Sequence, residues 1–441
     1  MRIRFWGTRG SIATPGPGTN HFGGNTSCVE LTTSGGDLLI FDCGTGVRPL
    51  AVELMANSAR PLRASILLGH THWDHIQGFP FFVPAFQPDN RIDIYAPEDS
   101  HRSLHEVLAG QMEFTYFPVD LGQLPATITY HDLTEGTREI GGARVVTQYL
   151  HHPAITLGYR VEADGVAVLY LTDHEPFSDK FWRGDAEPGR LESILHEGDR
   201  RHARFMAGAD LVIHDSQYTP EEYASKKTWG HSTYEYVVEL AAAAGAQRVA
   251  LTHHDPTHDD KFVAEIERKA QAVAAQRGSP IEVFCAYEGC ELHLTPSRVL
   301  QPFTAAEPLS VPVLHRSFRI LVVDDDPLVR RLATKILQQN GHAVIEAANG
   351  VEALRLVDAE RPDLMVLDLD MPELPGLEVL KILRSKPVTA HLPVLILTAT
   401  GDEQTTRAGF DAGASDYLTK PFSIPQLTAR VHACLARAAS G

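Results

Sequence analysis

Short apolar runs separated by Gly, Ser and Pro dominate the first two thirds of the chain and predict a strand-rich domain. Two later stretches, 232–244 and 260–276, have the period of amphipathic helices. Two strand-rich halves with helices outside them favour a layered αββα sandwich. The predicted strands are 2–6, 27–32, 37–41, 65–68, 92–95, 144–150, 157–162, 166–171, 211–214 and 249–251.

The last third of the chain alternates regularly between strand and helix patterns. Five βα units predict a doubly wound α/β domain with a five-stranded parallel, flavodoxin-like sheet of order 2-1-3-4-5. A proline-rich stretch without a sustained apolar period precedes it and predicts a stiff linker. We therefore expect domains at 1–295 and 318–441 joined by a linker at 296–317. The expected strands lie near 319–323, 343–347, 364–367, 393–397 and 415–418.

Composition narrows the class of protein. No apolar run approaches the roughly 20 residues that span a bilayer, and the N-terminus lacks the apolar core of a signal peptide. With five scattered cysteines, which fit a reducing compartment, this predicts a cytoplasmic protein without a membrane partner. The net charge of −17 argues against a nucleic-acid backbone as partner, because such polyanions are held by stripes of Lys and Arg.

Histidine and aspartate cluster in the segment His70-Thr71-His72-Trp73-Asp74-His75, directly after an apolar strand. A strand that runs into a tight loop can turn all four of these ligand side chains toward one cavity. Imidazole and carboxylate suit Zn²⁺, Mn²⁺ or Fe²⁺, and four ligands in six residues are enough for two ions. The segment therefore predicts a dinuclear metal site.

The segment 1–295 resembles the metallo-β-lactamase superfamily, whose signature is this His-x-His-x-Asp-His loop. The resemblance implies a hydrolase with two divalent metals, Zn²⁺ first among the candidates. The residues implied for the first metal are His70, His72 and His152; those for the second are Asp74, His75 and His253; Asp173 is implied as the bridge.

Two of these ligands lie in histidine doublets, so each has an alternative. His152 is preferred over His151 because it precedes Pro153, as in similar sequences, and His253 is preferred over His254. Two metals would lower the pKa of a bridging water and neutralise charge on the attacking and leaving oxygens. Asp74 would orient the resulting hydroxide. A loop at Asp42-Cys43-Gly44 resembles the one that supports the metal loop in this family.

Asp215, at the end of a strand, and the segment Trp229-Gly230-His231-Ser232-Thr233 resemble the phosphodiesterase branch of that superfamily, which includes tRNase Z and cyclic phosphodiesterases. There a matching histidine protonates the leaving alkoxide or contacts the phosphate, and a carboxylate holds it. The resemblance assigns these catalytic roles to His231 and Asp215, although tRNase Z usually has Glu in the acidic position.

A small phosphodiester, such as a cyclic nucleotide, is the expected substrate. The sequence has no long basic or Gly-rich insertion that could grip a tRNA. A lactone or thioester hydrolase on the same metals is one alternative, and a signalling adaptor with vestigial metals is another. Aromatic residues near the metal loop are candidates to stack a base, with core packing as the competing interpretation for each: Trp73, Phe79, Phe81, Phe82 and Phe86.

Carboxylates also follow two strands of the second predicted domain: Asp324, Asp325 and Asp326 follow one, and Asp368 follows another. Neighbouring parallel strands bring such side chains together at the carboxyl edge of the sheet, and clustered carboxylates suit Mg²⁺. The sequence therefore predicts a second metal site, of a harder type than the first.

Residues 318–438 resemble a response-regulator receiver domain across their whole length. The resemblance implies a cognate histidine kinase or phosphotransfer protein as partner. Phosphorylation would then tune the hydrolase, through the linker or through dimerisation of the receiver. The implied roles are Asp368 as phospho-acceptor, Asp324, Asp325 and the Asp370 carbonyl as Mg²⁺ ligands, Thr398 and Lys420 as phosphoryl contacts, Tyr417 as a switching aromatic, and a cis Lys420–Pro421 bond.

Overall fold

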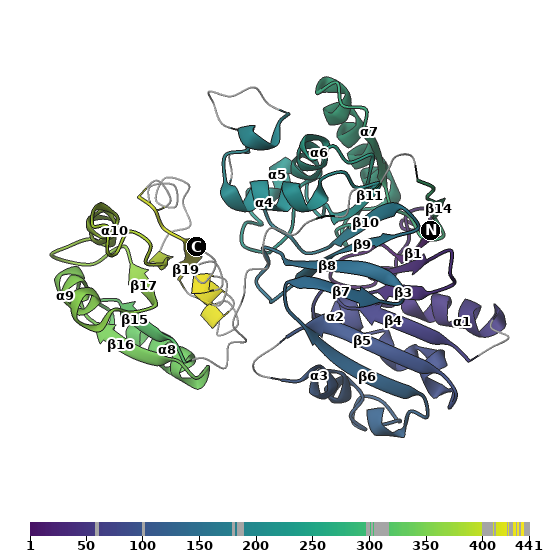
Figure 1. Ribbon diagram of the computed structural model, residues 1–441, viewed down its shortest axis with the longest axis horizontal. Helices are drawn as coiled ribbons and strands as arrows, with labels where there is room; N and C mark the ends of the chain where they lie inside the picture. The colour runs from purple at the N-terminus through teal and green to yellow at the C-terminus, as the bar shows by residue number, and fades with distance from the viewer. Residues whose placement is uncertain are drawn as a thin grey trace. The chain divides into compact units, whose positions relative to one another are not determined.

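The computed structural model divides the chain into two compact units, Met1–Ala305 (unit 1) and Ala306–Gly441 (unit 2) (Figure 1). This division falls inside the stretch that we predicted as a linker. The residues that the structure describes are 1–57, 61–98, 102–178, 181–182, 189–296, 300, 303, 317–398, 409, 412–420, 422, 427–428, 430–431 and 434–435.

Unit 1 contains two seven-stranded sheets. The first has the order β14 (Glu291–His293), β1 (Arg2–Gly7), β2 (Cys28–Thr32), β3 (Leu38–Phe41), β4 (Arg63–Leu67), β5 (Arg91–Pro97) and β6 (Thr127–Leu133). The second has the order β13 (Glu282–Cys285), β12 (Arg248–Thr252), β11 (Leu211–Asp215), β10 (Val166–Leu171), β9 (Leu157–Ala163), β8 (Ala143–Tyr149) and β7 (Gly136–Ile140).

Three apolar clusters hold these layers together. One lies between the sheets and joins residues such as Phe5 and Phe41 to Val161 and Val168. A second packs α1 (Val47–Asn57) and α3 (Leu104–Gln111) on the first sheet. The third packs α4 (Glu197–Met206), α6 (Tyr234–Ala243) and α7 (Asp260–Gln276) on the second sheet. The predicted αββα sandwich is confirmed (Figure 1).

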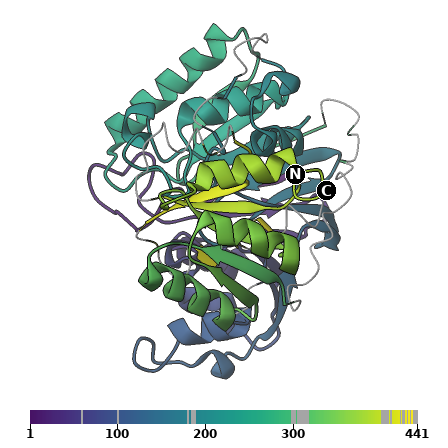
Figure 2. The ribbon, with the colours of Figure 1, turned by 90° about the vertical axis from the view of Figure 1, so that its left-hand side faces the viewer.

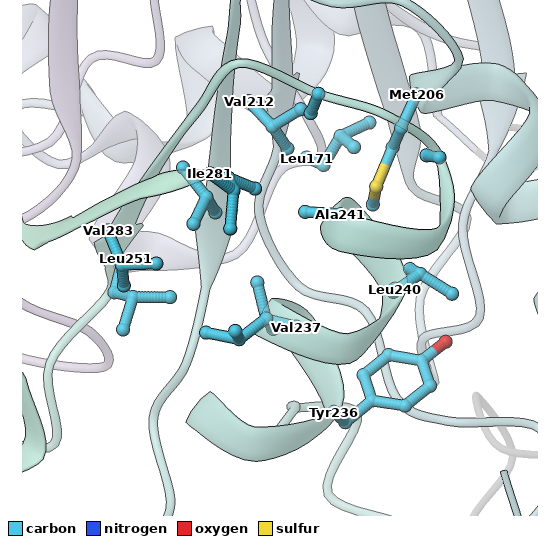
Figure 3. Packing of buried hydrophobic residues seen from close by; sticks show 14 of the residues in the cluster. Leu171, Met206, Val212, Tyr236, Val237, Leu240, Ala241, Leu251, Ile281 and Val283 are labelled. Carbon is cyan, nitrogen blue, oxygen red and sulfur yellow. The ribbon is translucent and has the colours of Figure 1, made fainter. Parts of the chain in front are cut away.

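The third cluster fixes the strand ends that carry functional residues. Figure 3 shows Val237, Leu240 and Ala241 of α6 packed in one cluster with Val212 of β11 and Leu251 of β12. These apolar side chains are all fully buried. Because β11 and β12 end at Asp215 and Thr252, this packing holds the edge of the sheet from which polar side chains project.

Short helical elements complete unit 1. Thr233 caps α6 by accepting a hydrogen bond from the backbone N–H of Tyr236, so the helix predicted from residue 232 begins one or two residues later. The remaining short elements are α2 (Trp73–Ile76), α5 (Pro220–Tyr223) and the 3₁₀ turns η1 (Phe79–Phe81), η2 (Val83–Phe86), η3 (Leu121–Gln123) and η4 (Leu191–Ser193).

The four strands of unit 1 that the hydrophobic pattern did not predict are the four edge strands, β6, β7, β13 and β14. Three of them show the reason plainly. In β6, the sequence Thr-Ile-Thr-Tyr-His-Asp-Leu has only its last residue buried; β7 likewise has one buried residue, and β14 has none. An edge strand lacks the continuous apolar run of an interior strand, because one of its sides faces solvent.

Unit 2 is the predicted doubly wound domain. Its five parallel strands have the order β16 (Ala343–Ala347), β15 (Arg319–Val323), β17 (Leu364–Asp368), β18 (Val394–Thr398) and β19 (Asp416–Thr419), which is the expected 2-1-3-4-5. The helix α8 (Pro327–Gln339) packs on one face; α9 (Gly350–Glu360) and α10 (Gly376–Ser385) pack on the other (Figure 2). Among the described residues, no helix is both long and apolar enough to cross a membrane.

Candidate metal centre

Strand ends from both sheets of unit 1 bring the predicted ligands together. The His70–His75 segment follows β4 and runs into α2, and His152 follows β8. Asp173 follows β10 and His253 follows β12. Because β10, β11 and β12 are adjacent and parallel, their carboxyl ends meet at one edge of the second sheet.

The ligands form two groups. In the first, single nitrogen atoms of His70, His72 and His152 all lie within 4.8 Å of one another. The second contains Asp74, His75 and His253, with Asp74 Oδ2 at 3.1 Å from His253 Nε2 and 3.3 Å from His75 Nε2. These are the two ligand sets that the resemblance implied.

Asp173 lies between the two groups. Its Oδ2 atom is 3.1 Å from His75 Nε2 and 3.7 Å from His253 Nε2, on the side of the second group. Its Oδ1 atom is 3.9 Å from His152 Nε2, on the side of the first. A carboxylate that presents one oxygen to each group has the placement of a bridging ligand.

The structure separates the two histidine doublets. His151 turns away from the cluster: its Nδ1 lies 2.9 Å from the carbonyl oxygen of Glu175, and its ring stacks on Phe177 at 4.2 Å. His254 also turns away, with Nε2 at 2.9 Å from the carbonyl oxygen of Ala286. The neighbouring residues His152 and His253 instead direct ring nitrogens into the cluster, and their role as ligands stays a prediction.

The cluster fits divalent metals. Both ring nitrogens of His70 are buried without a hydrogen-bond partner, an arrangement that costs about 1–3 kcal/mol per atom unless another ligand compensates. Burial lowers the pKa of His70 well below its usual range and that of His152 to about 3, so both imidazoles are neutral, which is the ligating form. His75 Nε2 and Asp173 Oδ2 approach each other without hydrogen-bond geometry, as ligand atoms directed at a common point do.

A second layer of contacts orients the ligands. Asp42 Oδ2 lies 2.6 Å from His75 Nδ1 and also accepts a hydrogen bond of 2.6 Å from the Tyr170 hydroxyl. Asp42 Oδ1 accepts from the Gly69 backbone N–H, just before His70. The Asp42 loop thus supports the metal loop, and contacts of this kind fix the ligating nitrogen of an imidazole. Sequence reasoning did not find Tyr170, because its strand reads as apolar core.

Backbone groups orient two more ligands. The carbonyl oxygen of Gly230 lies 3.0 Å from His152 Nδ1 and leaves Nε2 of that ring for the cluster. The backbone N–H of Ser11 donates to Asp74 Oδ2 at 2.8 Å. The loop after β1, which contains Ser11, thus contacts a candidate ligand directly.

His231 and Asp215 lie together beside the cluster. His231 Nδ1 is 3.4 Å from Asp215 Oδ2 and 3.6 Å from Asp173 Oδ1. Asp215 is buried and accepts hydrogen bonds from the backbone N–H groups of His174 and Ser232. Burial would raise the pKa of Asp215, but hydrogen bonds from His214 and His231 hold it below its usual range, so the carboxylate is ionised. The geometry brings together the predicted acid and its carboxylate.

Two of the aromatic residues considered for stacking do not reach solvent. Phe79 and Phe82 are 1% and 0% exposed and pack in the cluster between α1, α3 and the first sheet, so the core-packing interpretation holds for these two. Phe86 is half-buried against the same cluster. Trp73 and Phe81 are exposed. Stacking on a base remains open only to exposed rings.

The predicted receiver residues also meet at one edge of a sheet. Oxygen atoms of Asp324, Asp325 and Asp368 lie within 4.8 Å of one another. Lys420 Nζ is 2.6 Å from Asp324 Oδ2 and 3.0 Å from Asp368 Oδ2. Burial raises the pKa of Asp368, a shift that the Lys420 ammonium opposes.

Other residues predicted for the receiver site are not part of this group of carboxylates. Thr398 ends β18 beside this cluster and is buried, and its carbonyl oxygen accepts a hydrogen bond from the Lys420 N–H. Tyr417 is half-buried within β19. Asp370 is exposed two residues after Asp368 and is not among the grouped carboxylates. Pro421, and with it the predicted cis bond, lies outside the described residues.

The αββα sandwich has the metallo-β-lactamase fold, and a mostly buried set of imidazoles and carboxylates that could hold metal ions lies at its strand ends. The family models agree with this class: residues 38–254 match the beta-lactamase superfamily domain, and residues 320–432 match the response regulator receiver domain. The chain therefore joins a hydrolase domain of the beta-lactamase superfamily to a receiver domain.

Each of the following similar proteins covers one unit. The response regulator MprA of Mycobacterium ulcerans is 50% identical over 121 residues, which are 27% of this chain and 51% of MprA. The chain thus spans about half the length of the curated relatives it matches. The metallo-beta-lactamase fold protein YhfI of Bacillus subtilis is 16% identical, with a TM-score of 0.47 over 66% of this chain and 99% of YhfI. The short form of human tRNase Z is 21% identical, with a TM-score of 0.44 over 66% of this chain and 99% of that chain.

Proposed function

We propose that unit 1 is a two-metal phosphodiesterase that acts on a small phosphodiester, such as a cyclic nucleotide. The observation that carries this proposal is the pair His231 and Asp215, placed against the Asp173 carboxylate that faces both ligand groups. A phosphodiester needs a proton donor for its leaving alkoxide in addition to a nucleophile. The pair supplies a donor at the edge of the cluster.

The residues divide the reaction between them. Two divalent metals, Zn²⁺ in our proposal, would be held by the two ligand groups, would lower the pKa of a water molecule between them and would neutralise charge on the phosphate. Asp74 holds an ionised carboxylate that can orient the attacking oxygen: burial opposes this ionisation, but His75 and His253 keep its pKa below the usual range. His231 has its Nδ1 atom toward Asp215, which leaves Nε2 to donate a proton to the leaving oxygen.

The test compares two leaving groups in the His231→Ala variant. Hydrolysis of cyclic AMP releases a ribose alkoxide, which requires a proton. Hydrolysis of bis(p-nitrophenyl) phosphate releases a weakly basic phenolate, which does not. We expect turnover of cyclic AMP to fall by about 10²-fold or more and turnover of the nitrophenyl ester to fall much less. The control is His151→Ala, which removes a neighbouring imidazole that faces away from the ligands.

Other outcomes of this experiment identify the alternatives. Equal losses on both esters would show that His231 is not a proton donor. Turnover of lactones or thioesters without any phosphodiester turnover would favour a lactone or thioester hydrolase on the same metals. Purified protein that takes up no metal and hydrolyses none of these compounds would favour a signalling adaptor.

We also propose that phosphorylation of Asp368 regulates unit 1, with a histidine kinase or a phosphotransfer protein as donor and Mg²⁺ bound by Asp324, Asp325 and the Asp370 carbonyl. Thr398 and Lys420 would contact the phosphoryl group. Beryllofluoride, a phosphate mimic, should change the turnover of the full chain, either directly or through dimerisation. The Asp368→Asn variant should not respond. Equal turnover and an unchanged molecular mass with and without the mimic would contradict this regulation.

A further inference from the structure

A cation and an exposed indole lie next to the proposed proton donor. Lys226 Nζ is 4.2 Å from the ring centroid of Trp229 and 5.7 Å from that of Tyr218. The Tyr218 ring in turn meets the His231 ring edge-on, with 5.9 Å between centroids. Trp229 stands two residues before His231, and 56% of its surface is exposed. A chain of ring contacts thus links Lys226 to the site.

The loop that carries these residues is held by a buried carboxylate. Glu175 Oε1 accepts hydrogen bonds from the Thr228 N–H at 2.6 Å and the Tyr223 hydroxyl at 2.9 Å. Glu175 Oε2 accepts from the Gly230 N–H at 2.9 Å. Glu175 is only 3% exposed, so these are charge-assisted bonds in a site that excludes water. The position of Trp229 is therefore fixed on both sides of the residue.

Gly230 ties the same loop to a metal ligand. Its carbonyl oxygen contacts His152 Nδ1, and its φ of +88° is a conformation that favours glycine. A Cβ atom at this position would lie 2.1 Å from His152 Nδ1. The close approach of the loop to the cluster thus requires a glycine, which fixes Trp229 at a defined place beside the His152 side of the site.

The charge of Lys226 is not neutralised by an acidic neighbour. Among the ion pairs of the described residues, none involves its ammonium group. Its ammonium lies near the two aromatic rings, and the electron-rich face of a ring attracts a cation. In a chain of net charge −17, an unpaired ammonium beside a site for phosphate provides local attraction for an anion.

We propose that Lys226 and Trp229 form a binding site for the part of the substrate beyond the cleaved phosphodiester, and that this part is a nucleoside. Trp229 stacks on the base, and Lys226 attracts the phosphate and orders the indole. Stacking of a base on an aromatic side chain tightens binding by about 5- to 150-fold, so Trp229 has a large share of the affinity for the base. This inference rests on the proposed phosphodiesterase function, because it places the phosphate at the metal cluster.

Binding of two phosphate compounds to the zinc-loaded full chain tests the proposal. The compounds are 5′-AMP and ribose 5-phosphate, which share a sugar phosphate and differ only by the base. Calorimetry should show AMP binding at least about tenfold more tightly. In Trp229→Ala this preference should disappear while ribose 5-phosphate binds as before. Trp229→Phe keeps an aromatic face and should retain most of the preference.

The lysine has a matched control in its neighbour. Lys226→Gln should weaken the binding of both compounds by a similar few-fold factor. Added salt should remove this difference in affinity between the variant and the original chain. Lys227→Gln changes the adjacent lysine and should bind both compounds normally. Equal binding of AMP and ribose 5-phosphate by the original chain, or an equal loss of both in Trp229→Ala, would overturn the proposal. Calorimetry measures binding without turnover, so its result can be interpreted even if the phosphodiesterase assay fails.

Discussion

The two candidate metal sites of this chain are built on different plans. In unit 1, five imidazoles and two carboxylates form the two ligand groups, all of them buried except His72, and several are fixed from behind by residues such as Asp42 and by the Gly230 carbonyl oxygen. In unit 2, three carboxylates share their site with the ammonium of Lys420, and Asp325 is exposed. One site is dominated by nitrogen and supported from behind; the other consists of carboxylate oxygens, of which only those of Asp325 belong to an exposed residue.

This difference between the two sites fits the different roles proposed for them, catalysis in unit 1 and switching in unit 2. Imidazole-rich sites with fixed ring orientations suit a borderline metal that stays with the protein. Carboxylate sites that are partly open suit Mg²⁺, which keeps several water molecules and exchanges readily. In the receiver, the pKa of Lys420 is lowered by burial but raised more by Asp324 and Asp368, so its ammonium is a resident cation between them. Catalysis and switching thus place different demands on similar side chains.

The largest effect should follow from removal of the carboxylate that faces both ligand groups. Asp173→Ala is expected to lower turnover of bis(p-nitrophenyl) phosphate by about 10³-fold or more, because several kcal/mol of transition-state stabilisation depend on both metals. Phosphorylation of Asp368 by a small phosphodonor should proceed as before. Steady-state kinetics and phosphoprotein gels measure the two. Retention of more than a tenth of the turnover would break the comparison, since a bridge would then be dispensable.

A smaller effect should follow from the support behind His75. Asp42→Asn keeps the shape of the side chain but removes its charge, and the affinity for zinc should fall by about 10–100-fold. Competition with a chromogenic chelator measures this affinity. Asp37→Asn, at the other end of β3, is the control, because Asp37 contacts Thr33 and no ligand. Unchanged zinc affinity in the Asp42 variant would mean that rigid support is not what distinguishes the first site.

The smallest effect concerns the resident cation of the receiver. In Lys420→Met, Asp324 and Asp368 face each other without a positive charge, so Mg²⁺ no longer competes with an ammonium. The affinity for Mg²⁺ should rise by about two- to fivefold, the modest value expected for a pair that is partly exposed. Titration calorimetry with Mg²⁺ measures it, with Lys386→Met on the surface as control. A fall in affinity would show that Lys420 supports the metal site rather than competing for it.

The ligands could be predicted from the sequence because they are local in the chain or stand at strand ends. The His70–His75 loop contains four of them, and an apolar strand followed by Asp or His marks Asp173 and His253. The partners behind the ligands could not be predicted, since Tyr170 has the pattern of a core residue and Gly230 contacts His152 through its backbone carbonyl oxygen. Contacts across 78 or 128 residues of sequence leave no local signal.

The fold shows the same division between local and distant information. Interior strands such as β10 were predicted with their observed bounds because every residue is buried. Edge strands such as β6 were not, because their burial depends on which neighbour they pair with. Phe79 and Phe82 were ambiguous for a related reason: an aromatic residue beside a metal loop has the same sequence signal whether it lines a site or fills the core beneath it.

Three functional residues, Asp42, Asp173 and His253, have φ values of +59°, +65° and +59°, a region that residues other than glycine avoid. Such a conformation costs on the order of 1–3 kcal/mol at each position. Selection for thermal resistance alone, without a demand for turnover, would therefore favour glycine at these three positions. Each such replacement would relax the backbone but remove a candidate ligand or its support. Variants stabilised in this way would therefore lose activity.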